Sequence, residues 1–134
     1  MNYKEITTWE LVCKEAAISP ELPNFSALPL GLEKYMTACY MRAIITRVIN
    51  GCDQKGKIWK PDYSNRQEAK YELWVWPDTG KQYPSGFGFA NTLFDYSYTH
   101  TCSGARLVFQ SVEKKKHALK YFEQVFINHL HYIE

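Results

Sequence analysis

The sequence has no apolar run that approaches the length of a membrane-spanning helix, and its charges are nearly balanced. The 134 residues include 16 basic and 14 acidic side chains, which gives a net charge of +2. A dedicated nucleic-acid-binding domain is usually clearly basic, so the net charge by itself does not support nucleic-acid binding. Only a local basic patch would support that class of function.

Cysteines are few and widely spaced. Cys13, Cys39, Cys52 and Cys102 include no close pair, which excludes the spacing of a zinc knuckle. The first residues show no apolar segment of the kind found in signal peptides, and nothing else marks the chain as secreted. We therefore expect a cytoplasmic protein with reduced thiols and no membrane association, and we predict neither a metal nor a cofactor.

Aromatic residues are abundant instead, at 16% of the chain. The segment from Trp59 to Phe109 contains all but one of the tryptophans, among glycine and proline residues that favour turns. Large aromatic side chains contribute strongly to cores and also favour interfaces, so this enrichment fits either role. The length is typical of a single domain, which we assign to residues 1–134.

Hydrophobic periodicity predicts three helices. The first runs from about Thr8 to Ala17, with Thr7 and Glu10 at the spacing of a capping box. The second runs from about residue 32 to 50 and ends before a glycine. The third follows Ser111, a favourable N-cap. Its apolar stripe consists of Ala118, Leu119, Phe122, Val125, Phe126, Leu130 and Ile133.

Three strands are predicted between the second and third helices, at residues 69–76, 87–91 and 105–109. The turn signal Pro77-Asp78-Thr79-Gly80 separates the first two strands. Strands that are grouped together favour an antiparallel sheet with helices on one side. The predicted fold is therefore α+β, with a three-stranded antiparallel sheet, helices packed on one face, and the order α-α-β-β-β-α.

Alternation along these strands would place Trp74, Trp76 and Arg106 on the face that the helices leave open. Aromatic rings beside an arginine can stack the bases of a single strand, or they can form a protein interface. The structural alternative is that the loops at 51–66 and 92–103 cover this face. Trp59, in the first of these loops, joins the three as a candidate binding residue.

Four segments follow one another in the second half of the chain: WKPD at 59–62, KYELW at 70–74, SGFGF at 85–89 and GARLVFQS at 104–111. With the final helix, they resemble a family of small uncharacterised proteins of Bacteroides-group gut bacteria and of their phages and mobile elements. The resemblance implies a mobile-element origin and an accessory role, with no established activity. That family has serine and cysteine where this chain has Ala105 and Val108, so these two positions offer no candidate for chemistry here.

Other polar groups have a structural and a functional interpretation. Arg106 would either form an ion pair with Asp62, Asp78 or Asp95, or clamp a carboxylate or phosphate. The run Lys114-Lys115-Lys116 is typical of a solvated helical face, with phosphate contact as the alternative. A positive charge on His129 and His131 would be favourable near a helix C-terminus.

The function predicted from these patterns is a non-catalytic binding or adaptor module of phage or mobile-element origin. It would act through its aromatic sheet face, in contact with a protein partner or a second copy, with Trp59, Trp74, Trp76 and Arg106 as binding residues. The alternative is a single-stranded nucleic-acid binding protein. A small enzyme centred on the 95–106 segment, with Asp95, His100, Cys102 and Arg106, is the third hypothesis.

Overall fold

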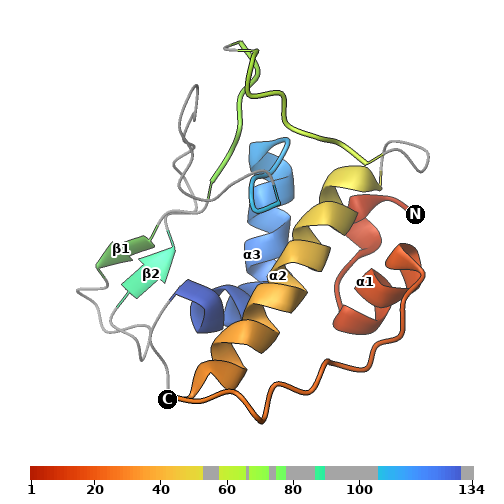
Figure 1. Ribbon diagram of the computed structural model, residues 1–134. Helices are drawn as coiled ribbons and strands as arrows, with labels where there is room; N and C mark the ends of the chain where they lie inside the picture. Colours follow the sequence, from red (N-terminus) through yellow and green to blue (C-terminus); the bar gives the residue numbers. More distant parts are fainter. Residues whose placement is uncertain (53–57, 66, 73–74, 78–86, 90–105, 131–134) are drawn as a thin grey trace.

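The structure is a computed structural model that describes residues 1–52, 58–65, 67–72, 75–77, 87–89 and 106–130 (Figure 1). Helices dominate this part of the chain. In sequence order the elements are the 3₁₀ turn η1 (Tyr3–Glu5), helices α1 (Trp9–Ala16) and α2 (Leu32–Gly51), strands β1 (Val75–Pro77) and β2 (Phe87–Phe89), and helix α3 (Val112–Leu130).

Helix α2 is the central element. Helix α3 packs along one side of it and α1 along the other, while η1 contacts its C-terminal half (Figure 1). No helix in the described ranges is long and apolar enough to cross a membrane.

The predicted three-stranded sheet with helices on one face is wrong. The described strands form a two-stranded antiparallel ribbon in which Val75 pairs with Phe89 and Pro77 with Phe87. The predicted third strand at 105–109 contributes only a single bridge, between Tyr71 and Phe109. Phe109 is fully buried and its ring meets that of Phe126 in α3 at a centroid distance of 6.4 Å. Val108 and Phe109 are consecutive and both fully buried, so these apolar residues insert into the core and do not form one face of a strand. A short apolar segment does not distinguish these two cases in the sequence.

The N-cap of the first helix lies one residue later than predicted. Thr8, not Thr7, is the N-cap of α1, and its hydroxyl accepts a hydrogen bond from the Leu11 backbone N–H. The capping box lies earlier, at Asn2 and Glu5, where it closes η1. Several neighbouring residues can cap a helix, so spacing alone does not choose between them.

The two long helices agree with their predicted positions. Helix α2 starts after Gly31, whose φ of 68° is favourable only for glycine, and it ends within one residue of its predicted end. Helix α3 starts after Ser111, whose hydroxyl accepts a hydrogen bond from the Lys114 N–H. Non-helical dihedrals at Phe122 kink α3 near its middle.

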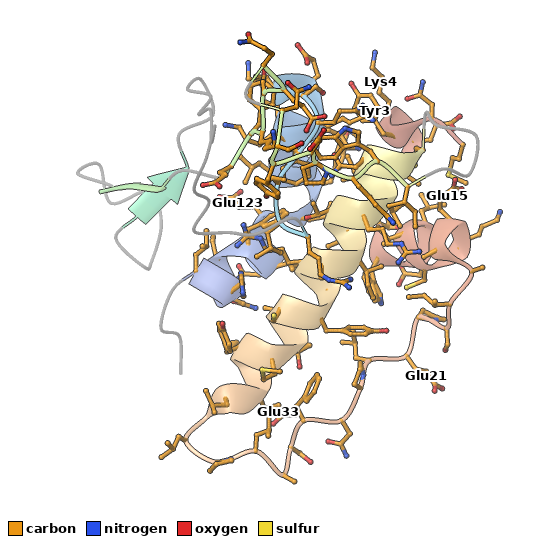
Figure 2. All side chains as sticks on the ribbon, turned by 45° about the horizontal axis from the view of Figure 1, so that its top comes forward. Tyr3, Lys4, Glu15, Glu21, Glu33 and Glu123 are labelled. Carbon is orange, nitrogen blue, oxygen red and sulfur yellow. The ribbon has the colours of Figure 1, made fainter. Side chains whose placement is uncertain are left out.

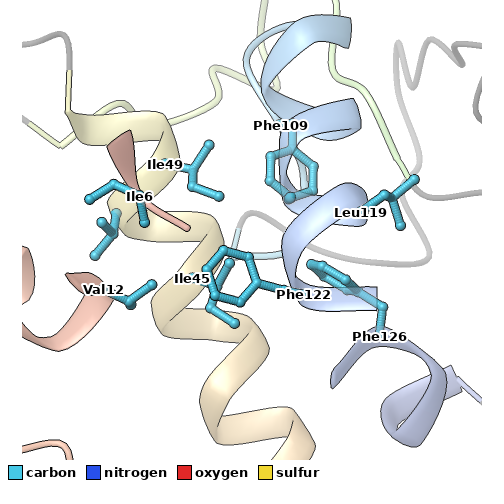
Figure 3. Packing of buried hydrophobic residues seen from close by; sticks show 10 residues of the cluster. Ile6, Val12, Ile45, Ile49, Phe109, Leu119, Phe122 and Phe126 are labelled. Carbon is cyan, nitrogen blue, oxygen red and sulfur yellow. The ribbon is translucent and has the colours of Figure 1, made fainter. Parts of the chain in front are cut away.

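The core lies between these helices and is closed by η1 and the segment before α3 (Figure 3). Ile45, Val48 and Ile49 of α2 meet the predicted apolar stripe of α3 from Ala118 to Phe126, whereas Leu130 at the end of that stripe is exposed and Ile133 lies outside the described residues. The ten buried residues of this cluster are Ile6, Val12, Ile45, Val48, Ile49, Phe109, Ala118, Leu119, Phe122 and Phe126.

Candidate ligand-binding pocket

A pocket of about 490 Å³ lies beside the C-terminal half of α2. Three parts of the chain line it. Ala43, Thr46, Arg47 and Asn50 follow one another at helical spacing on one face of α2. The segment Ile58 to Pro61 and the side chain of Arg106 complete the wall. We call this the basic pocket.

Two of the four predicted binding residues meet in the basic pocket. Trp59 is half-buried and Arg106 is exposed, and both line the wall although 47 residues separate them in the sequence. Trp74 lies outside the described residues. Trp76 lies in β1, but its side chain is outside the described part. Trp59 and Arg106 therefore line one pocket, which is formed by helix and loop and not by a sheet face.

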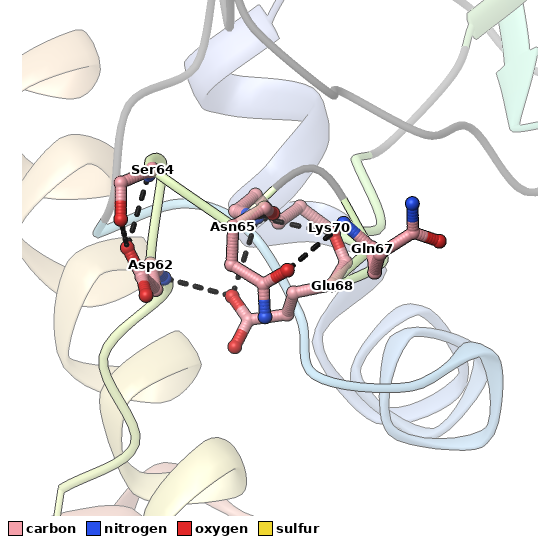
Figure 4. A network of polar contacts seen from close by, with 6 residues as sticks. All are labelled: Asp62, Ser64, Asn65, Gln67, Glu68 and Lys70. Carbon is pink, nitrogen blue, oxygen red and sulfur yellow. Dashed lines mark hydrogen bonds and ion pairs between the residues drawn. The ribbon is translucent and has the colours of Figure 1, made fainter.

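The segment that carries Trp59 is anchored by a network of polar contacts just after Pro61 (Figure 4). The Asp62 carboxylate accepts hydrogen bonds from the backbone N–H and hydroxyl of Ser64, which lower the pKa of Asp62. The backbone N–H of Asp62 donates to the Glu68 carboxylate at 2.7 Å. Of the ion-pair partners predicted for Arg106, Asp62 is thus engaged with Ser64, while Asp78 and Asp95 lie outside the described residues.

The same network contains a fully buried cation. The Lys70 ammonium donates to the carbonyl oxygens of Asn65 and Glu68, lies 3.3 Å from the Glu68 carboxylate, and faces the Tyr63 ring at 5.3 Å. A buried charge is tolerated only when such partners replace its hydration. Lys70 therefore holds the turn at 62–70 together and fixes the far end of the Trp59 segment.

Arg106 is positioned by a contact between α2 and the segment that precedes α3. The buried side chain of Asn50 donates to the Val108 carbonyl at 2.8 Å and accepts from the Gln110 N–H at 2.9 Å. This amide satisfies two backbone groups that have no sheet partner on that side, as a neighbouring strand would. The contact holds the chain two residues after Arg106 against α2, so the guanidinium reaches the pocket beside Arg47.

Three cations and one indole dominate the chemistry of the basic pocket. Arg47, Lys60 and Arg106 all line it, and no acidic side chain does so among the described residues. Within the same part of the chain, none of the three cations forms a hydrogen bond or an ion pair. Sequence analysis did not select Arg47, Lys60 or Asn50. The spacing of Ala43, Arg47 and Asn50 along one helix face was the available signal, but it does not reveal which loop covers that face.

The lysine run at the start of α3 is not the solvated face that its composition suggests. Lys114 is 4% exposed and Lys115 is fully buried, and only Lys116 is exposed. Lys114 donates to the Asn50 carbonyl at 3.2 Å and to the Gln110 side chain at 2.9 Å, and Lys115 donates to the Glu72 carbonyl. Lys114 thereby satisfies a carbonyl in the last turn of α2. Neither buried ammonium is available for phosphate contact.

A fourth buried cation lies nearer the N-terminal half of α2. Arg42 is 2% exposed and donates to Nδ1 of His129 in α3 at 2.7 Å, and its guanidinium lies over the Phe126 ring. Burial lowers the pKa of Arg42 to about 10. Because arginine has only donors, His129 accepts through Nδ1 and is neutral in this contact. Burial and Arg42 lower the pKa of His129, so the expectation of a positive His129 at the helix terminus is wrong.

The remaining predicted groups do not form a site in the described residues. Asp95, His100 and Cys102 lie outside these residues, as does His131. No set of three potential metal ligands comes together in the ranges that the structure describes. Cys13 is a buried free thiol whose pKa is raised by burial, and Cys39 is a half-buried free thiol.

Comparison of the chain with protein-family models, with characterised proteins and with solved structures gives no match.

Proposed function

We propose that the protein binds single-stranded nucleic acid through the basic pocket. The observation that supports this proposal is the convergence of Trp59 with three cations, Arg47, Lys60 and Arg106, that have no internal partner in the described residues. An indole stacks on the face of any base, and cationic side chains contact the phosphates that connect the bases. The volume of the pocket is in the range that accommodates a small ligand or one unit of a polymer.

The physical terms are of a size that gives measurable binding. Stacking of one base on Trp59 would contribute roughly 1–3 kcal/mol. Three phosphate contacts would give a salt dependence of about −2 in log K against log salt for a single strand, from a contribution of roughly 0.7 for each contact. Affinity would therefore fall by about an order of magnitude between 50 and 200 mM salt.

Binding of a single strand agrees better with these residues than the predicted protein interface on a sheet face does. That interface required a three-stranded sheet, which the described residues do not form. A double helix presents its bases edge-on in grooves, so it offers no ring face to Trp59, whereas an unpaired base does. An accessory role on a mobile element, which the family resemblance implies, is compatible with binding of single strands and is part of the proposal.

Fluorescence anisotropy with labelled ten-nucleotide strands at 50 mM salt tests this function. We expect saturable binding of single-stranded DNA or RNA, with weaker binding of the matching duplex. Trp59→Ala and Arg106→Ala should each weaken binding at least about fivefold, the equivalent of roughly 1 kcal/mol.

Lys34→Ala is the matched control, because Lys34 is an exposed cation at the opposite end of α2. It should leave binding within about twofold of the parent protein, since it removes the same charge from the same helix far from the pocket. No anisotropy change with any strand, or equal losses in Lys34→Ala and Arg106→Ala, would contradict the proposal. Preferential binding of an acidic peptide would also contradict it.

A further inference from the structure

A second, smaller hollow adjoins the basic pocket. It measures about 190 Å³ and lies between the end of α1 and the end of α2. Arg47 and Ile58 line both hollows, so the two are neighbours on either side of these side chains. Figure 2 shows Glu15 of the second hollow at the C-terminal end of α2, far from Glu33 at the other end. Its wall consists of Glu15, Ala16, Arg47, Val48, Gly51, Cys52 and Ile58.

The two hollows differ in charge. Among the described residues, the wall of the basic pocket has three cations, whereas the wall of the second hollow has one cation, Arg47, and one carboxylate, that of Glu15. The other described residues of this wall have small or apolar side chains. A phosphate in the second hollow would meet the carboxylate and gain little, because like charges repel. A neutral planar group would contact apolar side chains there and lose little binding free energy.

We infer that the site binds at least two consecutive nucleotides, and that it is not a site for a mononucleotide. In this arrangement one base stacks on Trp59 in the basic pocket, and the neighbouring base enters the second hollow. The phosphate that joins them lies against Arg47, the cation that both hollows share. The inference rests on the proposed function and specifies the minimum length of its ligand.

Displacement of a labelled ten-nucleotide strand by unlabelled ligands of increasing length tests the inference. The competitors are inorganic phosphate, a nucleoside 5′-monophosphate, a dinucleotide with one internal phosphate, and a trinucleotide. We expect the dinucleotide to compete about tenfold better than the mononucleotide, the equivalent of one added stacking or burial contact. Phosphate alone should compete weakest.

Leucine substitutions at two alanine positions distinguish the contributions of the two hollows to binding. Ala16 lines only the second hollow and Ala43 only the basic pocket, and both are half-buried helical residues. Ala16→Leu fills the second hollow, so the dinucleotide should fall to the affinity of the mononucleotide while the mononucleotide is unchanged. Ala43→Leu should weaken both ligands. Urea unfolding of each variant verifies that it is folded. Glu15→Gln, on the exposed rim, should strengthen binding of the dinucleotide more than binding of the mononucleotide.

The outcomes distinguish this inference from the proposed function. If the mononucleotide competes as well as the dinucleotide in the parent protein, the inference is overturned while binding of single strands stands. If Ala16→Leu is folded and retains the advantage of the dinucleotide, the second hollow is not part of the site. If no strand binds at all, the proposed function itself fails.

Discussion

The cations of this protein fall into two groups that differ in their partners. Arg42, Lys70, Lys114 and Lys115 are buried, and each donates to a carbonyl oxygen or a ring nitrogen. The acceptors of Lys70 lie within its own turn, and each of the other three cations donates to an acceptor that lies far away in the sequence. Arg47, Lys60 and Arg106 surround the basic pocket and donate to no group within the described residues. Three of the buried cations join distant segments and Lys70 holds a local turn, whereas the pocket group has no such partner among the described residues.

This difference shows that a cation is assigned to structure or to binding by the acceptors around it. Burial of an ammonium or guanidinium group requires acceptors that replace its hydration. The end of α2 supplies such an acceptor, because the carbonyls of its last turn have no partner within the helix. Lys114 meets one of them. Arg47, one turn earlier in α2, faces the basic pocket, where the other charged side chains of the described residues, Lys60 and Arg106, are also cationic.

The largest expected effect comes from Asn50, which connects the two groups. Asn50→Ala removes both hydrogen bonds to the 108–110 segment and leaves the buried Val108 carbonyl without that partner. We expect the free energy of unfolding to fall by about 2–4 kcal/mol, measured by urea denaturation. Strand binding should also weaken in the folded variant, because Arg106 is no longer held.

Gln124→Ala is the control for this variant, since Gln124 is an exposed amide that donates only to Asn128 in the next turn. Its effect should stay below about 0.5 kcal/mol. Equal effects of the two variants would show that the Asn50 contacts do not hold the junction.

The next effect concerns the buried lysine pair. Lys114→Met keeps much of the side-chain volume and removes the donor to the Asn50 carbonyl and the Gln110 side chain. We expect a loss of about 1–2 kcal/mol in the free energy of unfolding and no direct loss of strand binding. Lys116→Met, at the exposed neighbour, should be neutral within about 0.5 kcal/mol. A neutral Lys114→Met would mean that this buried cation does not belong with the structural group.

A pH-dependent effect is expected where Arg42 meets His129. The pKa of folded His129 is lowered from its ordinary value of 6.5, so the unfolded chain binds the proton first as the pH falls. The stability that neutral His129 provides is present above pH 6.5 and is lost as the pH falls through the lowered value. His129→Gln keeps an acceptor for Arg42 and removes the titration. Urea midpoints at pH 7.5 and 5.0 should therefore fall more in the parent protein than in the variant, whereas parallel decreases would refute this contribution.

The smallest effect on stability is expected at Arg47. Because Arg47 is exposed and has no internal partner in the described part, Arg47→Ala should change the free energy of unfolding by less than about 0.5 kcal/mol. The same change should reduce the salt slope of strand binding by roughly 0.7, the value for one phosphate contact. Anisotropy titrations at four salt concentrations measure the slope. A large loss of stability with an unchanged slope would place Arg47 with the buried cations.

The helices were predictable because their signals are local. Periodicity located α2 and α3, and Ser111 marked the start of α3, since a helix cap depends on residues three positions apart. The sheet was not predictable in the same way. The apolar residues at 107–109 indicated burial, but only the tertiary contacts of Phe109 determine whether this segment joins a sheet or packs against helices.

Half of the candidate site was selected from the sequence. Arg106 was chosen as a cation on the open face of the predicted sheet and Trp59 as an aromatic residue in a neighbouring loop, and both line the basic pocket. Their partners Arg47 and Lys60 were not chosen, because an exposed cation on a helix or in a loop has no distinguishing neighbour in the sequence. The lysine run at 114–116 had a stronger sequence signal, yet two of its three residues are buried.

The sequence by itself determined the positions of the two long helices, the apolar stripe of α3 from Ala118 to Phe126 and the Ser111 cap, because each depends on residues within one or two turns. Tertiary structure alone decided which cations are buried and which line the basic pocket. That choice depends on acceptors such as the Asn50 carbonyl, which lies 64 residues before Lys114 and comes within hydrogen-bonding distance only when α2 packs against α3.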